Sequence, residues 1–575
     1  MSQRESSAAA SEYDVAIIGG GPGGSTLGTL LRKYEPSMRV LILEREVFPR
    51  DHIGESQLPP ISAVLDEMGC WDKVEAADFP IKVGATFRWG ANPELWDFEF
   101  LPLSEFRVEP RPAKYRGFRK QTAFQVDRSI YDKILLDHAA EAGCEVRQGT
   151  AVVRVDVEGD RVRGLELKGG EIVRARRYVD ASGHVGILRK AFGVEMDVPT
   201  SLQNLALWDY WDNAKWAASI GVGGTRIQVM SQSRGWLWFI PLGPTRTSIG
   251  FVCPQAAFKS WGRTPEDVYQ EVVAAEERIG ALIQGATRTG EVRVTRDWSF
   301  VSARAYGENW FLVGEALGFA DPILSAGLTL THTAARELAY TILALDRGEH
   351  DPQWLCEQYE DNQQARVRQH IRFADYWYAS NGQFTDLKEH CQQIAADSGL
   401  RLEPHAAWAW LAQGGFSHDV LGQTGIGGYD LTAVKQLSHK FLAAGSTWKV
   451  SENNVFKLDL LGAKETSVPI YENGKIVPTP CLVRGKKRLV LAGMFKAVHD
   501  QLRRSPHIGV LHSALATSFA EKFSPEHAAV AMKFAVQVLE VMVGDGWVQA
   551  RHDPSKSKLH ITSPEEGHII HRHRG

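Results

Sequence analysis

The sequence lacks most of the features that mark secreted, metal-binding or membrane-spanning chains. Its six cysteines, in 575 residues, are scattered and form no CxxC pair. This argues against a zinc site or a disulfide framework and favours a reducing compartment. The N-terminal stretch MSQRESSAAASEYD has no apolar core of a signal peptide, and no apolar run is long enough to span a bilayer. We therefore expect a cytoplasmic protein without a membrane span.

A strong excess of charge of either sign is also missing. The net charge is -4, so no general affinity for nucleic acid is implied. The tail carries His568, His571 and His573, which we interpret as part of a frayed terminus rather than as a metal site. Tryptophan, at 17 residues, is abundant, which is consistent with flat aromatic surfaces around a ring-shaped ligand.

A dinucleotide-binding pattern opens the chain. The apolar run Val15–Ile18 is followed by Gly19, Gly21 and Gly24 in a GxGxxG turn and then by a helical pattern. Such glycines permit a tight turn, a close approach to a pyrophosphate, and close packing of helix and strand. Glu44 ends the next apolar strand, where an acid accepts the ribose hydroxyls of an adenosine.

Two later segments favour FAD as the dinucleotide. RYVDASGHVG, from 177 to 186, carries Asp180 and Gly183 in a turn after a strand, and NWFLVGEALGFADP, from 309 to 322, carries Glu315. Both resemble FAD-contact segments of the flavoprotein monooxygenase superfamily, which usually has Gly-Asp where this chain has Gly-Glu. The FAD domain is therefore interrupted.

The expected fold class is mixed α/β. A Rossmann-like FAD-binding domain (1–190 and 300–345) holds an inserted β-sheet substrate domain (191–299). A helical region (346–445) and an α/β C-terminal module (446–575) follow. In this module NG at 473–474 predicts a turn, and helices before an expected hairpin at GWVQARHDPSKSKLHITS suggest a winged-helix-like arrangement, which we interpret as a lid or docking surface.

Three further stretches carry chemistry. GWLWFIP, from 235 to 241, predicts a strand with Trp236 and Trp238 on one face, either as core packing or as a wall. FADPILSAG, from 319 to 327, leads into a helical run. KVGATFRWG begins at Lys82, and strand alternation predicts that Lys82 shares a face with Thr86 and Arg88.

These stretches resemble the flavin-dependent halogenase family. GWLWFIP matches its WxWxIP signature, FADPILSAG matches FxxPxxSxG, and Lys82 stands where the catalytic lysine of that family is expected. IGES (53–56) and FQVDR (124–128) add similar flanks, so the likeness covers roughly residues 12–380. Hydroxylases of the superfamily generally lack WxWxIP.

The resemblance implies a mechanism and a set of partners. FAD, supplied as FADH2 by a separate flavin reductase, reacts with O2 and with chloride or bromide to give hypohalous acid. This acid travels past the wall of Trp236 and Trp238 to Lys82, in a separate substrate pocket. Glu55 positions Lys82 or removes a proton from the halogenated ring.

The same resemblance assigns binding residues. Cofactor contacts are expected from Gly19, Gly21, Gly24, Glu44, Gln125, Arg128, Asp180, Gly183, Glu315, Pro322, Gly327 and Leu328. A halide site is expected at Ser325, Gly327 and Leu328, because a helix start with small residues suits an anion.

Three functions stay open at this point. The first is halogenation of an electron-rich aromatic such as a phenol, pyrrole or indole, either free or tethered to a carrier protein. The second is aromatic hydroxylation or another oxidoreductase reaction of the same superfamily. The third is a flavin-binding sensor or scaffold without turnover, which leaves WxWxIP and Lys82 unexplained.

Overall fold

The computed structural model describes residues 12–89, 94–101, 106, 109–198, 203–379, 449–485, 487–558 and 570–572. Among these residues no helix has the length and apolar character to cross a bilayer. The described part of the chain also holds no group of three His, Cys, Asp or Glu side chains placed to bind a metal ion.

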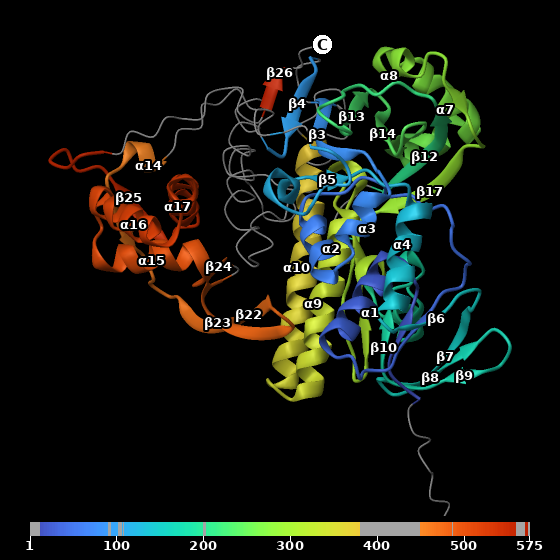
Figure 1. The fold of residues 1–575 in the computed structure, drawn as a ribbon, viewed down its shortest axis with the longest axis horizontal. Helices are drawn as coiled ribbons and strands as arrows, with labels where there is room; N and C mark the ends of the chain where they lie inside the picture. Colours follow the sequence, from blue (N-terminus) through green and yellow to red (C-terminus); the bar gives the residue numbers. More distant parts are fainter. Residues whose placement is uncertain are drawn as a thin grey trace, which may run out of the picture.

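A five-stranded parallel sheet forms the centre of the lower layer (Figure 1), in the order β19-β10-β1-β2-β6. Its strands are β1 (Tyr13–Ile18), β2 (Val40–Leu43), β6 (Glu145–Arg147), β10 (Ala175–Asp180) and β19 (Trp310–Leu312). Because neighbouring strands come from distant segments, the sheet has the interrupted Rossmann-like arrangement that the sequence predicted.

Helices surround this sheet. They are α1 (Pro22–Tyr34), α2 (Pro60–Met68), α3 (Trp71–Ala76), α4 (Arg128–Glu141), α5 (Ile187–Ala191), α9 (Gly327–Arg347) and α10 (Pro352–Ala379). Of these, α1, α4 and α5 contact its strands, and the others pack on these helices or on α9. His332 on α9 is fully buried and hydrogen-bonds Thr26 on α1 and Tyr131 on α4, each at 2.9 Å. Burial lowers the pKa of His332 to about 3, so it is a neutral structural link between three helices.

A larger mixed sheet forms the upper layer, in the order β16-β12-β15-β14-β13-β3-β4-β26, with β17 beside β12 and β5 beside β3. Its strands are β3 (Ile81–Arg88), β4 (Trp96–Glu99), β5 (Ala123–Phe124), β12 (Gln203–Asp212), β13 (Gly224–Gln232), β14 (Gly235–Pro241), β15 (Arg246–Pro254), β16 (Thr287–Arg288), β17 (Arg293–Trp298) and β26 (Ile570–Arg572). The predicted insertion 191–299 supplies only part of this sheet, because β3, β4 and β5 come from residues 81–124.

The two faces of the upper sheet have different coverings. On one face, α6 (Gln255–Trp261), α7 (Pro265–Ala274) and α8 (Glu277–Leu282) pack on Leu237 and Phe239. The other face carries Trp236 and Trp238 and meets α10 through Tyr378. The face with the tryptophans therefore looks into the molecule.

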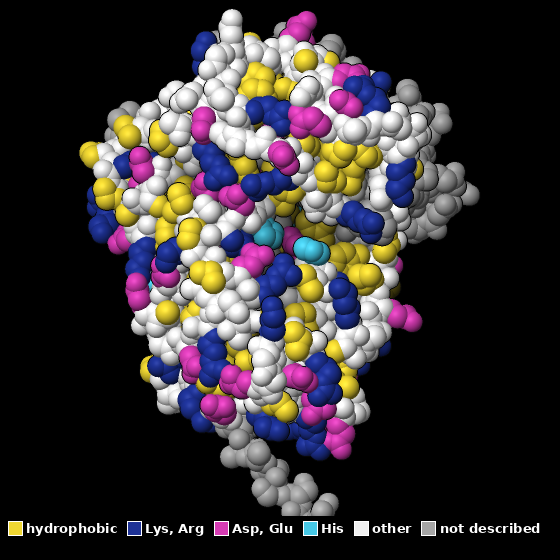
Figure 2. Space-filling view, turned by 90° about the vertical axis from the view of Figure 1, so that its right-hand side faces the viewer, with side chains coloured by type: hydrophobic (Ala, Val, Ile, Leu, Met, Phe, Trp, Pro, Cys, Tyr) yellow, Lys and Arg dark blue, Asp and Glu magenta, His cyan; other side chains and the backbone are white. Residues whose placement is uncertain are grey.

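Ion pairs join the two layers. Asp51, which follows β2, pairs with Arg246 on β15 at 3.2 Å and with Arg293 on β17 at 2.8 Å. From the side of α4 and α7 the surface is hollowed between the layers, and acidic, basic and histidine side chains gather around the hollow (Figure 2).

The described part of the C-terminal tail, Ile570–Arg572, is the strand β26. β26 pairs antiparallel with β4, and His571 lies opposite Asp97. The interpretation of this part as a frayed terminus was wrong, because backbone pairing with a distant strand cannot be seen in a short polar sequence. His568 and His573 lie outside the described residues.

The C-terminal module stands to one side of the two layers (Figure 1). It consists of α14 (Lys449–Glu452), β21 (Val455–Leu458), β22 (Lys464–Glu472), β23 (Lys475–Arg484), β24 (Lys487–Val490), α15 (Gly493–Arg504), α16 (Ile508–Lys522), α17 (Pro525–Gly544) and β25 (Val548–Arg551). β25, the first strand of the hairpin expected after α17, pairs with β21, about a hundred residues earlier, and residues 559–563 of that hairpin lie outside the described residues. Of the predicted helical region, α10 is described and 380–448 lie outside the described residues.

The β22–β23 hairpin attaches this module to the lower layer. Asn473 and Gly474 both have positive φ, as a type I′ turn requires and as the NG pair predicted. Arg347 on α9 donates to the carbonyl of Gly474 at 2.7 Å, and Arg336 donates to that of Tyr471 at 2.8 Å.

Shorter elements complete the chain. They are the strands β7 (Val152–Glu158), β8 (Arg161–Leu167), β9 (Ile172–Val173), β11 (Met196–Asp197), β18 (Phe300–Ser302) and β20 (Gly318–Phe319), with the 3-10 turns η2 (Gly117–Gln121), η3 (Gly183–Val185), η4 (Gly314–Ala316) and η5 (Pro322–Leu324).

Candidate active site

The three glycines of the turn between β1 and α1 have two different roles. A Cβ atom on Gly19 would clash with the carbonyl of Ala181, and a Cβ atom on Gly24 would clash with the carbonyl of Gly19. A Cβ atom on Gly21 would meet only Arg50 Nη2, at 3.5 Å. The fold itself therefore needs the first and third glycines, whereas Gly21 leaves space at the N-terminus of α1, where a pyrophosphate would approach.

Glu44 lies beside this turn. Its Oε2 accepts a hydrogen bond from the Gly20 N–H at 2.7 Å, and its Oε1 accepts one from the Glu46 N–H at 2.9 Å. The buried carboxylate thus holds the turn in place. Its contact with a ribose stays a prediction.

Replacing Gly21 with valine should remove FAD without unfolding the protein. We expect FAD content to fall at least about tenfold, because the side chain would hold the backbone away from the pyrophosphate. The thermal midpoint of the FAD-free protein should not change. Flavin absorbance of the purified variant measures this, with Gly24→Ala as the contrasting variant that destabilises the FAD-free fold as well. Full FAD content in Gly21→Val would contradict the assignment.

Arg128 is committed to protein contacts. Its Nε and Nη2 donate to the two oxygens of Asp132 at 2.7 and 2.8 Å, and its Nη1 donates to the carbonyls of Ile53 and Gly54. It therefore orients the segment before Glu55. The predicted phosphate contact of Arg128 stays a prediction.

Arg50 is a candidate that sequence reasoning missed. Its Nε lies 3.1 Å from Glu46 and its Nη1 lies 3.0 Å from Asp132, so Nη2 is directed toward Gly21. A guanidinium beside a helix N-terminus suits a pyrophosphate. No motif surrounds Arg50, and only the tertiary structure brings it to the turn.

Gln125 is a buried amide with free hydrogen-bonding capacity, and its contact with FAD stays a prediction. Its side chain is fully buried, and neither its Oε1 nor its Nε2 has a hydrogen-bond partner. A buried amide of this kind needs both a donor and an acceptor. The edge of an isoalloxazine supplies both, so the residues present fit FAD.

The turns after β10 and β19 bring two predicted residues together. A Cβ atom on Gly183 would lie 3.9 Å from Oε2 of Glu315, although the two residues are far apart in sequence. Burial raises the pKa of the Glu315 carboxyl, against the opposing effect of Arg128. Asp180 instead closes its own turn, since its oxygens accept from Ser182 and from the N–H of Leu188.

The predicted anion site lies where η5 meets α9. Pro322 starts η5, Ser325 adopts a left-handed conformation with φ of 57°, and α9 starts at Gly327 and continues with Leu328. The first N–H groups of a 21-residue helix have no acceptor within it and carry its positive dipole. Halide binding at these amides stays a prediction.

Lys82 lies beside a β-bulge in β3. Where β3 pairs with β13, Lys82 stands opposite Thr225 and Gly84 stands opposite Arg226. Val83 is therefore an extra residue that has no partner on β13. Such a residue shifts the alternation of side chains by one position.

The bulge moves Lys82 to the face that carries the indoles. Thr225, the partner of Lys82 on β13, shares a face with Val229, and Val229 pairs with Trp238 on β14. The prediction that Lys82 shares a face with Thr86 and Arg88 was wrong, because strict alternation fails across the bulge. Arg88 lies on the opposite face, where it pairs with Glu276 beside α8.

The surroundings of Lys82 are unusual for a lysine. It is 2% exposed, its Nζ lies 5.5 Å from the centroid of the Phe100 ring, and no carboxylate of the described residues pairs with it. Burial lowers the pKa of Lys82 from 10.5 to about 7. Both the amine and the ammonium are therefore available near neutral pH.

The two indoles lie side by side on β14, as alternation predicted. The ring centroids of Trp236 and Trp238 are 6.0 Å apart, and both side chains are buried. From the register, Trp238 lies about 14 Å along the strands and about 10 Å across them from Lys82. The indoles and Lys82 thus share one interior face without contact, and the role of the indoles as a wall stays a prediction.

Glu55 is buried beside two hydroxyl groups, and its action on Lys82 or on a substrate ring stays a prediction. Burial raises the pKa of Glu55 to about 7, against the lowering effects of the neighbouring hydroxyls of Tyr210 and Ser248 and of Arg128. Neither oxygen of Glu55 makes a hydrogen bond of standard geometry. A carboxyl with this pKa can exchange a proton near neutral pH.

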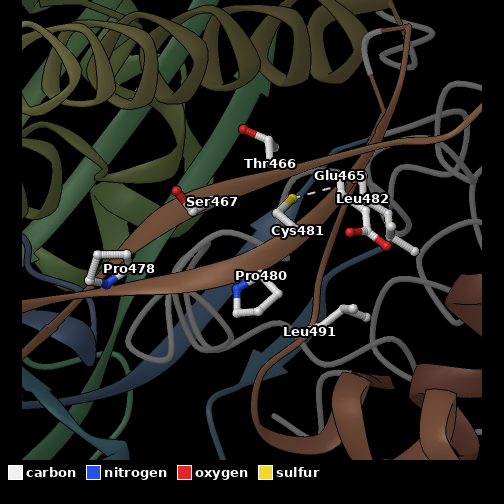
Figure 3. A pocket seen from close by; sticks show the side chains of 8 residues that line it. All are labelled: Glu465, Thr466, Ser467, Pro478, Pro480, Cys481, Leu482 and Leu491. Carbon is white, nitrogen blue, oxygen red and sulfur yellow. Dashed lines mark hydrogen bonds between the residues drawn. The ribbon is translucent and has the colours of Figure 1, made fainter.

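Two described cavities lie elsewhere. One, of about 320 Å³, is lined by side chains of β22 and β23 and by Leu491 (Figure 3). The other, of about 410 Å³, lies at the surface around Asp160 and Arg304. Neither contains a residue predicted for catalysis.

Comparison with known proteins identifies the family that the chain matches. The tryptophan halogenase family model matches residues 14–108 and 105–401. A tryptophan 2-halogenase of Chondromyces crocatus is 30% identical over 393 residues, which are 67% of this chain and 71% of that protein. A 1H-pyrrole-2-carbonyl-[peptidyl-carrier protein] chlorinase of Pseudomonas fluorescens is 29% identical over 68% of this chain and 91% of its own.

Solved structures agree with this assignment. The myxobacterial chondrochloren halogenase CndH is 30% identical, with a TM-score of 0.58 over 75% of this chain and 97% of its own. The flavin-dependent halogenase CmlS, at 23% identity, shares the fold with a TM-score of 0.71 over 96% of this chain and 98% of its own, which includes the C-terminal module. The chain thus belongs to the tryptophan halogenase family and is a flavin-dependent halogenase.

Proposed function

We propose that the protein uses FADH2 to form hypohalous acid and halogenates an electron-rich aromatic substrate through Lys82. The observation that carries this proposal is the buried Lys82, which has no acidic partner among the described residues and shares an interior face with Trp236 and Trp238.

FAD would be held by groups from several segments. The amides at Gly21, the guanidinium of Arg50 and the amide of Gln125 would bind its pyrophosphate and ring, with Glu315 nearby. When bound and reduced, FAD activates O2 so that chloride or bromide is oxidised to hypohalous acid. The start of α9 would hold the halide.

Lys82 would then hold the oxidant. As an ammonium it would donate a hydrogen bond to the oxygen of hypohalous acid, which makes the halogen more electrophilic, and it would give this proton to the departing hydroxide so that water leaves. The low-polarity surroundings, including Phe100, strengthen such a bond and exclude water. Glu55, with its pKa raised to about 7 by burial, would accept the proton that the halogenated ring releases.

The substrate and the partners follow from this chemistry. Electrophilic halogenation needs an electron-rich ring such as an indole, pyrrole or phenol. The relatives named for tryptophan and for a carrier-bound pyrrole favour an aromatic substrate that is either free or tethered to a carrier protein. A separate flavin reductase would supply FADH2, and we propose a cytoplasmic location.

The test is a comparison of turnover with and without halide. The FAD-loaded protein is reduced without O2, mixed with an indole, a pyrrole or a phenol, and exposed to O2 with chloride, with bromide or with neither. A halogenated product that requires halide is expected. A hydroxylated product without halide would support the hydroxylase, and flavin oxidation without any product would support the sensor.

A further inference from the structure

Trp236 is fixed by a residue far from it in the sequence. Its Nε1–H donates to the hydroxyl of Tyr378, at 2.8 Å, near the end of α10. Trp89 packs edge-on against both rings, at centroid distances of 6.3 and 5.7 Å. All three side chains are at most 2% exposed, so the indole is held on two sides.

The direction of the hydrogen bonds follows from the chemistry of the groups. An indole N–H only donates, so the Tyr378 hydroxyl accepts from it and keeps its own hydrogen for another acceptor. That acceptor is Oδ1 of Asp321, at 3.3 Å. Asn204 lies within 3.4 Å of both Tyr378 and Asp321 and donates to the same pair.

Asp321 connects this chain of bonds to the predicted halide site. Its Oδ1 also accepts from the Ile323 N–H at 2.9 Å and so caps η5. This turn runs directly into Ser325 and the start of α9. One carboxylate therefore holds both the indole anchor and the turn.

Trp238 has an anchor of a different kind. Its Nε1–H donates to Ser248 at 3.1 Å, on the neighbouring strand β15 of the same sheet. This bond keeps Trp238 within the upper sheet. Among the two indoles, only the anchor of Trp236 reaches the segment that starts α9.

We propose that Tyr378 is a positioning residue that fixes the Trp236 indole against the turn Pro322–Leu324 through Asp321. This proposal rests on the proposed function and extends it to a residue that lies outside both signature motifs. The position of the Trp236 indole would then depend on the turn Pro322–Leu324. The wall of Trp236 and Trp238 and the predicted halide site would therefore stay fixed relative to each other.

The experiment compares two tyrosine variants of the same helix in the full-length, FAD-loaded protein. Tyr378→Phe removes the hydroxyl between Trp236 and Asp321. Tyr359→Phe is the matched control, because Tyr359 is equally buried and loses a single bond, 2.7 Å long, to the carbonyl of Leu312. Halogenated product per FADH2 consumed is measured for each. The indole is followed by 19F NMR of 5-fluorotryptophan, with the resonance assigned by Trp236→Phe.

We expect Tyr378→Phe to shift the Trp236 resonance and to lower product per FADH2 about fivefold, which corresponds to about 1 kcal/mol. Tyr359→Phe should change neither. An unchanged resonance would overturn the proposal, as would a shifted resonance with unchanged product yield when the wild type halogenates. Absence of halogenated product from the wild type would refute the proposed function, and a resonance shift confined to Tyr378→Phe would still support the anchor.

Discussion

Replacing Lys82 with methionine should abolish halogenation while FAD binding and flavin oxidation continue. We expect product formation to fall at least about 10²-fold, the usual effect of removing a group that stabilises charge in a reacting complex. Methionine retains most of the apolar stem and fills the site next to Phe100. Product yield and flavin oxidation are measured in parallel under halide.

The same substitution should stabilise the protein. Folding lowers the pKa of Lys82 from 10.5 to about 7, so the unfolded chain binds more protons between these values. The cost of burying the ammonium, about 5 kcal/mol, is full below pH 7 and declines by about 1.4 kcal/mol per pH unit up to pH 10.5. Lys82→Met should therefore melt well above the wild type at pH 7 and close to it near pH 10.

Two lysine variants control this result. Lys82→Arg should also be inactive, because the larger, planar guanidinium cannot place a single compact donor where the Lys82 ammonium lies. Lys114→Met removes a lysine whose side chain is 71% exposed and should change stability by at most about 0.5 kcal/mol. Wild-type product yield from Lys82→Met would remove Lys82 from the mechanism, and an equal stability gain at pH 7 and pH 10 would contradict the lowered pKa.

Removing the indoles of Trp236 and Trp238 should uncouple the consumption of FADH2 from halogenation. In a variant with Trp236→Leu and Trp238→Leu, the oxidant would no longer be confined, so peroxide release should rise and halogenated product per FADH2 should fall severalfold. Leucine is chosen because alanine at both buried tryptophans would cost about 3–5 kcal/mol each and endanger the fold. Peroxide and product are measured from the same reaction.

The control for the wall lies on the same strand. Leu237→Val changes the volume of a buried side chain on the opposite face, against α7, and should leave the ratio of product to peroxide unchanged. An unchanged ratio in the double leucine variant would show that the indoles only pack.

The sequence determined those parts of the fold and the site that depend on short stretches of chain. GxGxxG defined the strand, turn and helix, because each glycine acts on neighbours within a few residues. The NG pair determined the turn of the β22–β23 hairpin for the same reason. Alternation placed Trp236 and Trp238 on one face, since no bulge interrupts β14.

Only the tertiary structure decided which distant segments meet. Lys82 lies on the opposite face from the one that strict alternation predicted, because the bulge at Val83 adds one residue to β3 relative to β13. The register of this pair is set by strands more than a hundred residues apart. Arg50 reaches Gly21, and Tyr378 reaches Trp236, without any motif of their own. A sequence pattern records the period of one element, whereas register, bulges and buried hydrogen bonds depend on the partner that packs against it.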